Sequence, residues 1–187
     1  MSSTIEIEVT YLAARVPEDL AGCICKELED IYFPATAEHA KVRIRRSDKV
    51  YEFTKKTPLD QNDAGRQKEE NVALTGDEFA ALAKGDGRRL VKTRYYLPYD
   101  SLIAEVDIFQ GELAGLVIIE FEFKSPEAKE AFTMPNFCLA DITQDAYFAG
   151  GLLAGRTYAE VAPELARYHY QPLHFRTAGP QTAATAA

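Results

Sequence analysis

Residues 5–10 read Ile-Glu-Ile-Glu-Val-Thr, a strict alternation of apolar and polar side chains. A period of two is typical of a β-strand, in which successive side chains point to opposite faces of the sheet. The three β-branched apolar residues therefore share one face. Glu6 and Glu8 project together from the other face, about 7 Å apart, so this strand carries a paired-acid face that is costly to build unless it binds something.

The same alternation recurs over residues 116–123, Leu-Val-Ile-Ile-Glu-Phe-Glu-Phe, where Glu120 and Glu122 again share a face. Further strands are predicted over 41–46 and 50–56 as a hairpin, then over 67–74, 90–97 and 104–109. Residues 58–65 are polar and typical of a loop. The sequence therefore indicates a mainly β protein.

Three helices are predicted. Leu20, Ile24, Leu28 and Ile31 recur at spacings of three or four, which indicates a helix over residues 17–31. The segment 75–78 offers capping residues for a short helix. Ser125, followed by proline, begins a third helix that extends to residue 132.

In the alternating pattern of the strands, almost every position on the polar face carries an ionisable side chain. Positive and negative charges lie mostly on different strands. An ordinary antiparallel sheet with one wet face would also alternate, but solvated faces usually mix in neutral polar residues. If the sheet instead closes into a barrel with its polar faces inward, these charges must be paired or bound to ions. The positions are Glu6, Glu8, Glu52, Glu69, Glu105, Asp107, Glu120 and Glu122, with Arg43, Arg45, Lys56, Lys92 and Arg94.

An interior with both signs of charge suits a ligand that combines an anion with a metal. Polyphosphate chelated to Mg²⁺ or Mn²⁺ fits this description, because carboxylates bind hard divalent cations whereas Arg and Lys bind phosphate oxygens. The matching chemistry is phosphoryl transfer to water.

Composition and charge narrow the class of protein further. The 187 residues, 47% of them hydrophobic, suit one domain over residues 1–176, and the Thr/Ala-rich stretch 177–187 is predicted to be a disordered tail. The net charge of -8 argues against general binding to nucleic acid or to an anionic membrane.

No apolar run is long enough to cross a bilayer, and residues 1–4 do not resemble a signal peptide, so we expect a cytoplasmic protein. The three cysteines lack the spacing of a zinc site or of a disulfide framework.

The ordered set of motifs resembles the CYTH family, the triphosphate tunnel metalloenzymes, which includes thiamine triphosphatases, inorganic triphosphatases and class IV adenylate cyclases. Residues 6–10, Glu-Ile-Glu-Val-Thr, correspond to the opening ExExK signature of that family and match its two glutamates. The match continues, in order, through Arg43-Ile44-Arg45, Phe53-Thr54-Lys55-Lys56, Lys92-Thr93-Arg94, Glu105-Val106-Asp107, residues 115–122, Phe132, Pro135 and the Asp141–Tyr147 segment.

The resemblance implies an α+β, mainly β fold: an eight-stranded antiparallel closed barrel that forms a triphosphate tunnel, with helices packed outside. It implies that Glu6, Glu8, Glu120 and Glu122 hold Mg²⁺ or Mn²⁺, and that Arg43, Arg45, Lys56, Lys92 and Arg94 bind the triphosphate. Glu6, Glu8 and Lys56 are the predicted catalytic residues. The expected enzyme hydrolyses the terminal phosphoanhydride of an inorganic or small organic triphosphate.

Three positions depart from the family pattern. The signature lysine is Thr10, Ala149 stands where Asn is frequent, and Gln67 stands where a basic residue is expected. Loss of a charge-assisted phosphate contact costs about 1.5–3 kcal/mol. A catalytically weakened polyphosphate-binding module and a class IV-type adenylate cyclase are therefore the alternatives, and the outward apolar faces leave a homodimer open.

Overall fold

A computed structural model describes residues 2–60 and 63–175. The described residues form nine β-strands, which are β1 (Ser2–Ala13), β2 (Ile24–Phe33), β3 (Val42–Ser47), β4 (Val50–Asp60), β5 (Asp63–Leu74), β6 (Arg88–Tyr99), β7 (Leu102–Phe109), β8 (Val117–Glu122) and β9 (Cys138–Asp141). Their helices are short: η1 (Glu18–Gly22), α1 (Gly76–Leu82), η2 (Gly111–Leu113), α2 (Pro126–Glu130), η3 (Ala146–Phe148), α3 (Gly150–Leu153) and α4 (Tyr158–Ala166).

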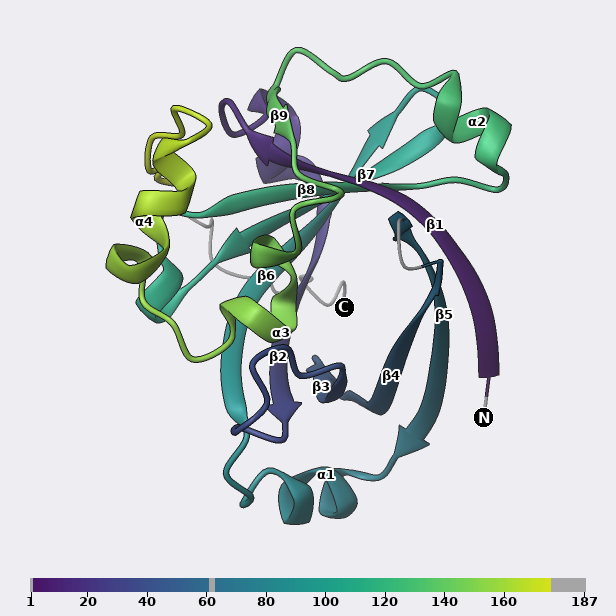
Figure 1. Ribbon diagram of the computed structural model, residues 1–187, viewed down its shortest axis with the longest axis vertical. Coiled ribbons are helices and arrows are strands. Elements are labelled where there is room, and N and C mark those ends of the chain that lie inside the picture. The colour runs from purple at the N-terminus through teal and green to yellow at the C-terminus, as the bar shows by residue number, and fades with distance from the viewer. Residues whose placement is uncertain (1, 61–62, 176–187) are drawn as a thin grey trace, which may run out of the picture.

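Eight of these strands close into an antiparallel barrel. The order is β5-β4-β3-β2-β6-β7-β8-β1, and residues 2–7 of β1 pair again with β5 to complete the ring. β9 pairs with the later part of β1, on the edge opposite β8. In Figure 1, β1 begins beside β5 at the N-terminal end and curves away toward β9. The predicted closed barrel is confirmed.

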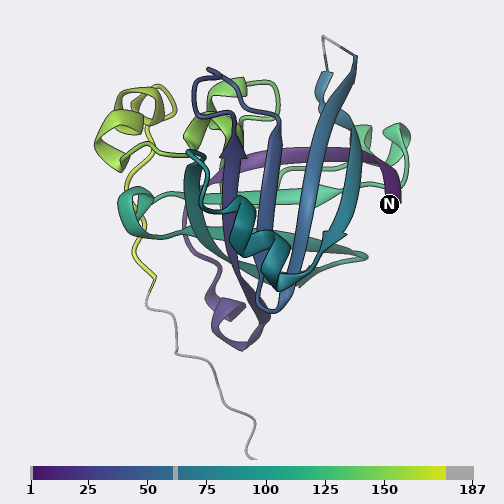
Figure 2. The ribbon, with the colours of Figure 1, turned by 90° about the horizontal axis from the view of Figure 1, so that it is seen from below.

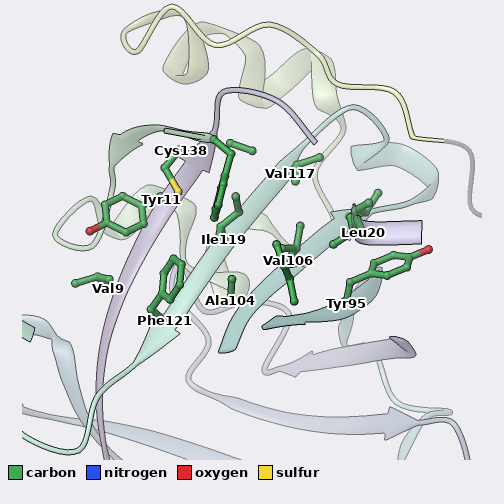
Figure 3. Packing of buried hydrophobic residues seen from close by; sticks show 14 of the residues in the cluster. Val9, Tyr11, Leu20, Tyr95, Ala104, Val106, Val117, Ile119, Phe121 and Cys138 are labelled. Carbon is green, nitrogen blue, oxygen red and sulfur yellow. The ribbon is translucent and has the colours of Figure 1, made fainter. Parts of the chain in front are cut away.

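The apolar faces of the strands point outward, and other segments cover part of them, whereas Ile5, Val72 and Val91 stay exposed. Val9 and Tyr11 of β1, Val106 of β7 and Ile119 of β8 belong to one large buried cluster that also takes in Leu20 of η1 (Figure 3). Figure 2 shows α1 lying across the outside of the barrel, where its Phe79 packs with residues of β2 and β3. Apolar packing on the outside of the barrel therefore orients the charged faces toward the interior.

At one end the inward faces change from charged to apolar. Leu12 follows Glu8 and Thr10 on β1, Ile118 precedes Glu120 on β8, and both are almost fully buried. These apolar residues form a second cluster with side chains of η3, α3 and α4. Packing from these C-terminal helices thus closes off the interior beyond the charged section.

Two local predictions are wrong. The segment predicted as a helix over residues 17–31 contains only η1, and β2 follows as a strand between β3 and β6. The stretch 58–65 is mostly strand, because the β4–β5 hairpin extends to Asp60 and resumes at Asp63. The capped helices after Thr75 and Ser125 are confirmed as α1 and α2.

Residues 177–187 lie outside the described residues, so the predicted tail stays a prediction. Within the part of the chain that the structure describes, no helix has the length and hydropathy needed to span a membrane.

Candidate active site

The barrel encloses a cavity of about 540 Å³. Its lining includes every metal-binding and substrate-binding residue predicted from the sequence: Glu6, Glu8, Arg43, Arg45, Lys56, Lys92, Arg94, Glu120 and Glu122. These residues come from five strands, β1, β3, β4, β6 and β8, so the closed barrel is what brings them together. The remaining wall comes from residues 39–41, from the β4–β5 hairpin and from the segment 142–151.

The paired acids of β1 lie where this strand changes partners. Residues 2–7 pair with β5, whereas residues 8–12 pair with β8. Glu6 therefore lies opposite Gln67, and Glu8 lies opposite Glu122. The strand register thus places an acid of β1 directly across from an acid of β8, as the resemblance implies for a metal site.

Lys56 is the cation nearest to the acids of β1. Its Nζ lies 2.5 Å from Glu6, 3.4 Å from Glu69 and 3.9 Å from Glu8. Burial raises the pKa of Glu8 to about 7, against the opposing effect of Lys56 and with help from the charge of Glu120. One ammonium group therefore does not neutralise the carboxylates around it.

The residues present fit a hard divalent cation. Glu6, Glu8, Glu120 and Glu122 offer only carboxylate oxygens, the ligands that Mg²⁺ and Mn²⁺ prefer, and their mutual repulsion favours an added positive charge. In the described ranges, no three acidic, histidine or cysteine side chains already converge on one point. Metal binding would thus draw these carboxylates together. Glutamate side chains can make this movement by changing rotamer, without a change in the backbone.

The cations of β6 are held in a buried network. Arg94 donates to Asp107 at 2.7 and 2.6 Å and to Glu120 at 2.5 Å, and it also contacts Glu105. Lys92 contacts Asp107. Despite burial, Arg94 and Lys92 hold the pKa of Asp107 at about 2. These ion pairs fix both cations in place with their charges facing the interior.

Asp30 of β2 is a site residue that sequence reasoning missed. It accepts two hydrogen bonds from Arg45, at 2.6 and 2.7 Å, and lies 3.8 Å from Arg43. Despite complete burial, these two guanidinium groups lower its pKa far below the usual range. Asp30 escapes sequence reasoning because the apolar spacing in its segment predicts a helix, whereas the segment is the strand β2. Its one signal in the sequence is that Arg43 and Arg45 share an inward face, because buried cations need acidic partners.

Arg43 retains bonding capacity. Its Nη1 donates to the Tyr32 hydroxyl at 3.3 Å, and its Nη2 lies 3.7 Å from Glu69. Its Nε is buried and has no hydrogen-bond partner among the residues that the structure describes. A buried N–H without a partner costs about 1–3 kcal/mol, so this guanidinium is not fully satisfied by protein groups.

The three positions that depart from the family pattern all line the cavity. Thr10 lies opposite Glu120, and its backbone N–H donates to Thr143 Oγ1 at 3.0 Å. Gln67 turns back on its own hairpin and donates to the Ala64 carbonyl at 2.9 Å. Ala149 precedes α3. At Thr10 the polar section of β1 ends, so a short neutral group stands where the resemblance implies an ammonium.

A closed antiparallel barrel whose interior carries paired acids on two adjacent strands, with a facing set of Arg and Lys, defines the class of triphosphate tunnel proteins. The chain belongs to the CYTH family of triphosphate tunnel metalloenzymes, whose members are generally metal-dependent. It is 30% identical over 152 residues to the inorganic triphosphatase of Nitrosomonas europaea, covering 80% of this chain and 96% of the relative. No family model matches the chain.

Solved structures agree with this assignment. The crystal structure of an inorganic triphosphatase superposes with a TM-score of 0.59 at 27% identity, over 80% of this chain and 94% of that one. A Bacillus halodurans protein provisionally assigned as an adenylate cyclase superposes with a TM-score of 0.51 at 18% identity, over 94% of this chain and 96% of that one. The second likeness bears on the fold alone.

Proposed function

We propose that this protein hydrolyses the terminal phosphoanhydride of an inorganic or small organic triphosphate, with Mg²⁺ or Mn²⁺ as cofactor. The observation that carries the proposal is the composition of the barrel interior. The predicted metal ligands and phosphate-binding residues line one cavity, and the named relative with 30% identity is an inorganic triphosphatase.

The balance of charge inside the barrel supports the metal requirement. The cations Arg43, Arg45, Lys56, Lys92 and Arg94 are outnumbered by the acids around them, which are Glu6, Glu8, Asp30, Glu69, Glu105, Asp107, Glu120 and Glu122. A triphosphate adds several more negative charges. It can therefore bind in this interior only together with further positive charge, which a divalent cation supplies.

The roles of the residues follow from their positions. Arg43, Arg45, Lys92 and Arg94 line the cavity, where guanidinium and ammonium groups would bind the phosphate oxygens and fix the orientation of the chain. Glu6 and Glu8 of β1, with Glu120 and Glu122 of β8, would hold the metal. When bound, the metal neutralises charge that develops on the phosphate oxygens and helps to orient the attacking water.

Lys56 connects the two groups of residues. Its ammonium contacts Glu6, Glu69 and Glu8, so it holds the acids of β1 in place while it can also donate to a phosphate oxygen. Burial disfavours its charged form, yet Glu8 and Glu6 raise the pKa of Lys56 above its ordinary value. It therefore stays charged at neutral pH.

Release of inorganic phosphate tests the proposal. Purified protein would be incubated with tripolyphosphate, ATP or thiamine triphosphate in the presence of Mg²⁺ or Mn²⁺, with a chelator as control. We expect release from at least one triphosphate, abolished by the chelator. An absence of turnover with every substrate and metal would overturn the proposal.

Thr10 favours a second candidate, a tunnel that binds polyphosphate without hydrolysing it. A neutral residue at this position removes one cation from the charged section of β1. Calorimetry that shows tight polyphosphate binding, together with no turnover by the wild type or by Thr10→Lys, would favour this candidate. A homodimer and a cytoplasmic location stay predictions, which light scattering and cell fractionation would test.

A further inference from the structure

Lys41, directly before β3, is an exposed cation that also lines the cavity, and the site described above does not include it. It lies two residues from Arg43 and four from Arg45, so the three side chains share the inward face of this segment. Its carbonyl accepts a hydrogen bond from the Lys56 amide at 3.2 Å, which keeps its backbone in the β3–β4 ladder. The three cations thus form a row about 13 Å long on one wall.

Among the described residues, Lys41 differs from the other cations of the cavity in having no acidic partner. Arg43, Arg45, Lys56, Lys92 and Arg94 each lie within 4.0 Å of at least one carboxylate. No described carboxylate lies within this distance of the Lys41 ammonium, although Asp60 and Asp145 line the same cavity. In this part of the chain, water and not a counter-ion therefore surrounds the Lys41 charge.

The backbone around Lys41 is fixed, and the wall beside it includes His39 and several small residues. Arg88 donates to the carbonyls of Ala37, Glu38 and Gly151 at 2.8, 3.1 and 2.7 Å, which ties the loop before Lys41 to α3. Ala149 and Gly151 line the cavity on this side. A fixed backbone that carries an exposed lysine into the cavity lining suits an anionic group bound in the cavity.

We infer that Lys41 is a further substrate-binding residue. A linear polyphosphate bound at Arg43 and Arg45 would extend toward the start of β3, where the Lys41 ammonium would donate to its phosphate oxygens. The inference rests on the proposed function, since it names an additional contact in the same cavity. An anionic occupant is favoured over a neutral organic group because the ammonium is the one charge on this part of the wall that lacks a counter-ion among the described residues.

Lys55 provides a matched control. It follows in the same hairpin, opposite Val42 in the ladder, and it is exposed on the outside of the barrel. We expect Lys41→Gln to raise KM for tripolyphosphate about five- to tenfold with little change in kcat. Lys41→Arg should stay close to the wild type because it keeps the charge, and Lys55→Gln should leave both constants unchanged.

Equal KM values for Lys41→Gln and Lys55→Gln would overturn the inference, and so would a fall in kcat at unchanged KM. If the wild type does not hydrolyse any triphosphate, the proposed function fails by itself. Calorimetric titration of the same three variants with tripolyphosphate and Mn²⁺ then decides the role of Lys41. A Kd raised about five- to tenfold in Lys41→Gln alone supports it, and identical Kd values contradict it.

Discussion

Glu8 of β1 lies directly opposite Glu122 of β8 in the antiparallel ladder. Like charges in this arrangement are destabilising unless something neutralises them. Lys56 lies 3.9 Å from Glu8, but its ammonium is shared with Glu6 and Glu69. The Glu8–Glu122 pair is therefore where we expect a divalent cation to bind. Glu122→Gln should weaken Mn²⁺ binding by about tenfold or more, because it removes a charged ligand, as measured by calorimetry without substrate.

Glu70→Gln is the control for this measurement, because Glu70 lies on β5 and pairs with Lys68 outside the cavity lining. It should bind Mn²⁺ like the wild type. Equal affinities in all three proteins would place the metal elsewhere.

Thr10→Lys should increase the affinity for tripolyphosphate by about one to two orders of magnitude, since a charge-assisted contact contributes about 1.5–3 kcal/mol. Thr10 lines the cavity opposite Glu120, which would partner the new ammonium. KM and the calorimetric Kd measure the change. Ser3→Lys adds the same charge to an exposed part of β1, and an equal gain in both variants would show that only overall charge matters.

Asp30→Asn should lower the free energy of unfolding at pH 7 by about 3 kcal/mol, because it leaves Arg45 and Arg43 without their buried counter-ion. The pKa of Asp30 is lowered in the folded state. Its contribution to stability is therefore complete above the unfolded pKa of about 3.9 and is lost as the pH falls below that value. Chemical denaturation at a series of pH values should show the difference between the two proteins narrowing below about pH 4. A constant difference would contradict the ion-pair account.

Gly151→Ala should destabilise the protein by about 1–3 kcal/mol or more, because a Cβ there would lie 1.9 Å from the Ala40 carbonyl oxygen. The clash would separate α3 from the loop that carries Lys41. At Gly22 a Cβ would meet nothing within 4 Å, so Gly22→Ala should be close to neutral. Thermal unfolding compares the two, and similar Tm values would show that the contact between α3 and the loop is not tight.

Most strands and the inward residues could be predicted, because one period-2 pattern determines both. Glu120 and Glu122, for example, alternate with apolar neighbours that face the outer core. Parity therefore assigned each to the interior before the order of the strands was known. The alternation of apolar and polar residues does not show that the sheet closes on itself. That expectation came from the resemblance to the CYTH family.

β2 and Asp30 could not be predicted in the same way. Leu28 and Ile31 are both buried, yet they lie on opposite faces of β2, opposite Lys92 and Ile44. A strand that buries both faces loses its alternation, and a spacing of three then imitates a helix. The wall around Lys41 depends on contacts between residues 37–41 and 149–151, which are too distant in sequence for any local pattern to reveal.

Phosphate release from tripolyphosphate by wild type, Glu8→Gln and Glu70→Gln, each with Mg²⁺ or Mn²⁺, tests the central claim most directly. Glu8 lines the cavity opposite Glu122, whereas Glu70 lies outside the cavity lining. The account predicts metal-dependent release by the wild type and Glu70→Gln, and a loss of at least about a hundredfold in Glu8→Gln. Equal rates in all three proteins would contradict it.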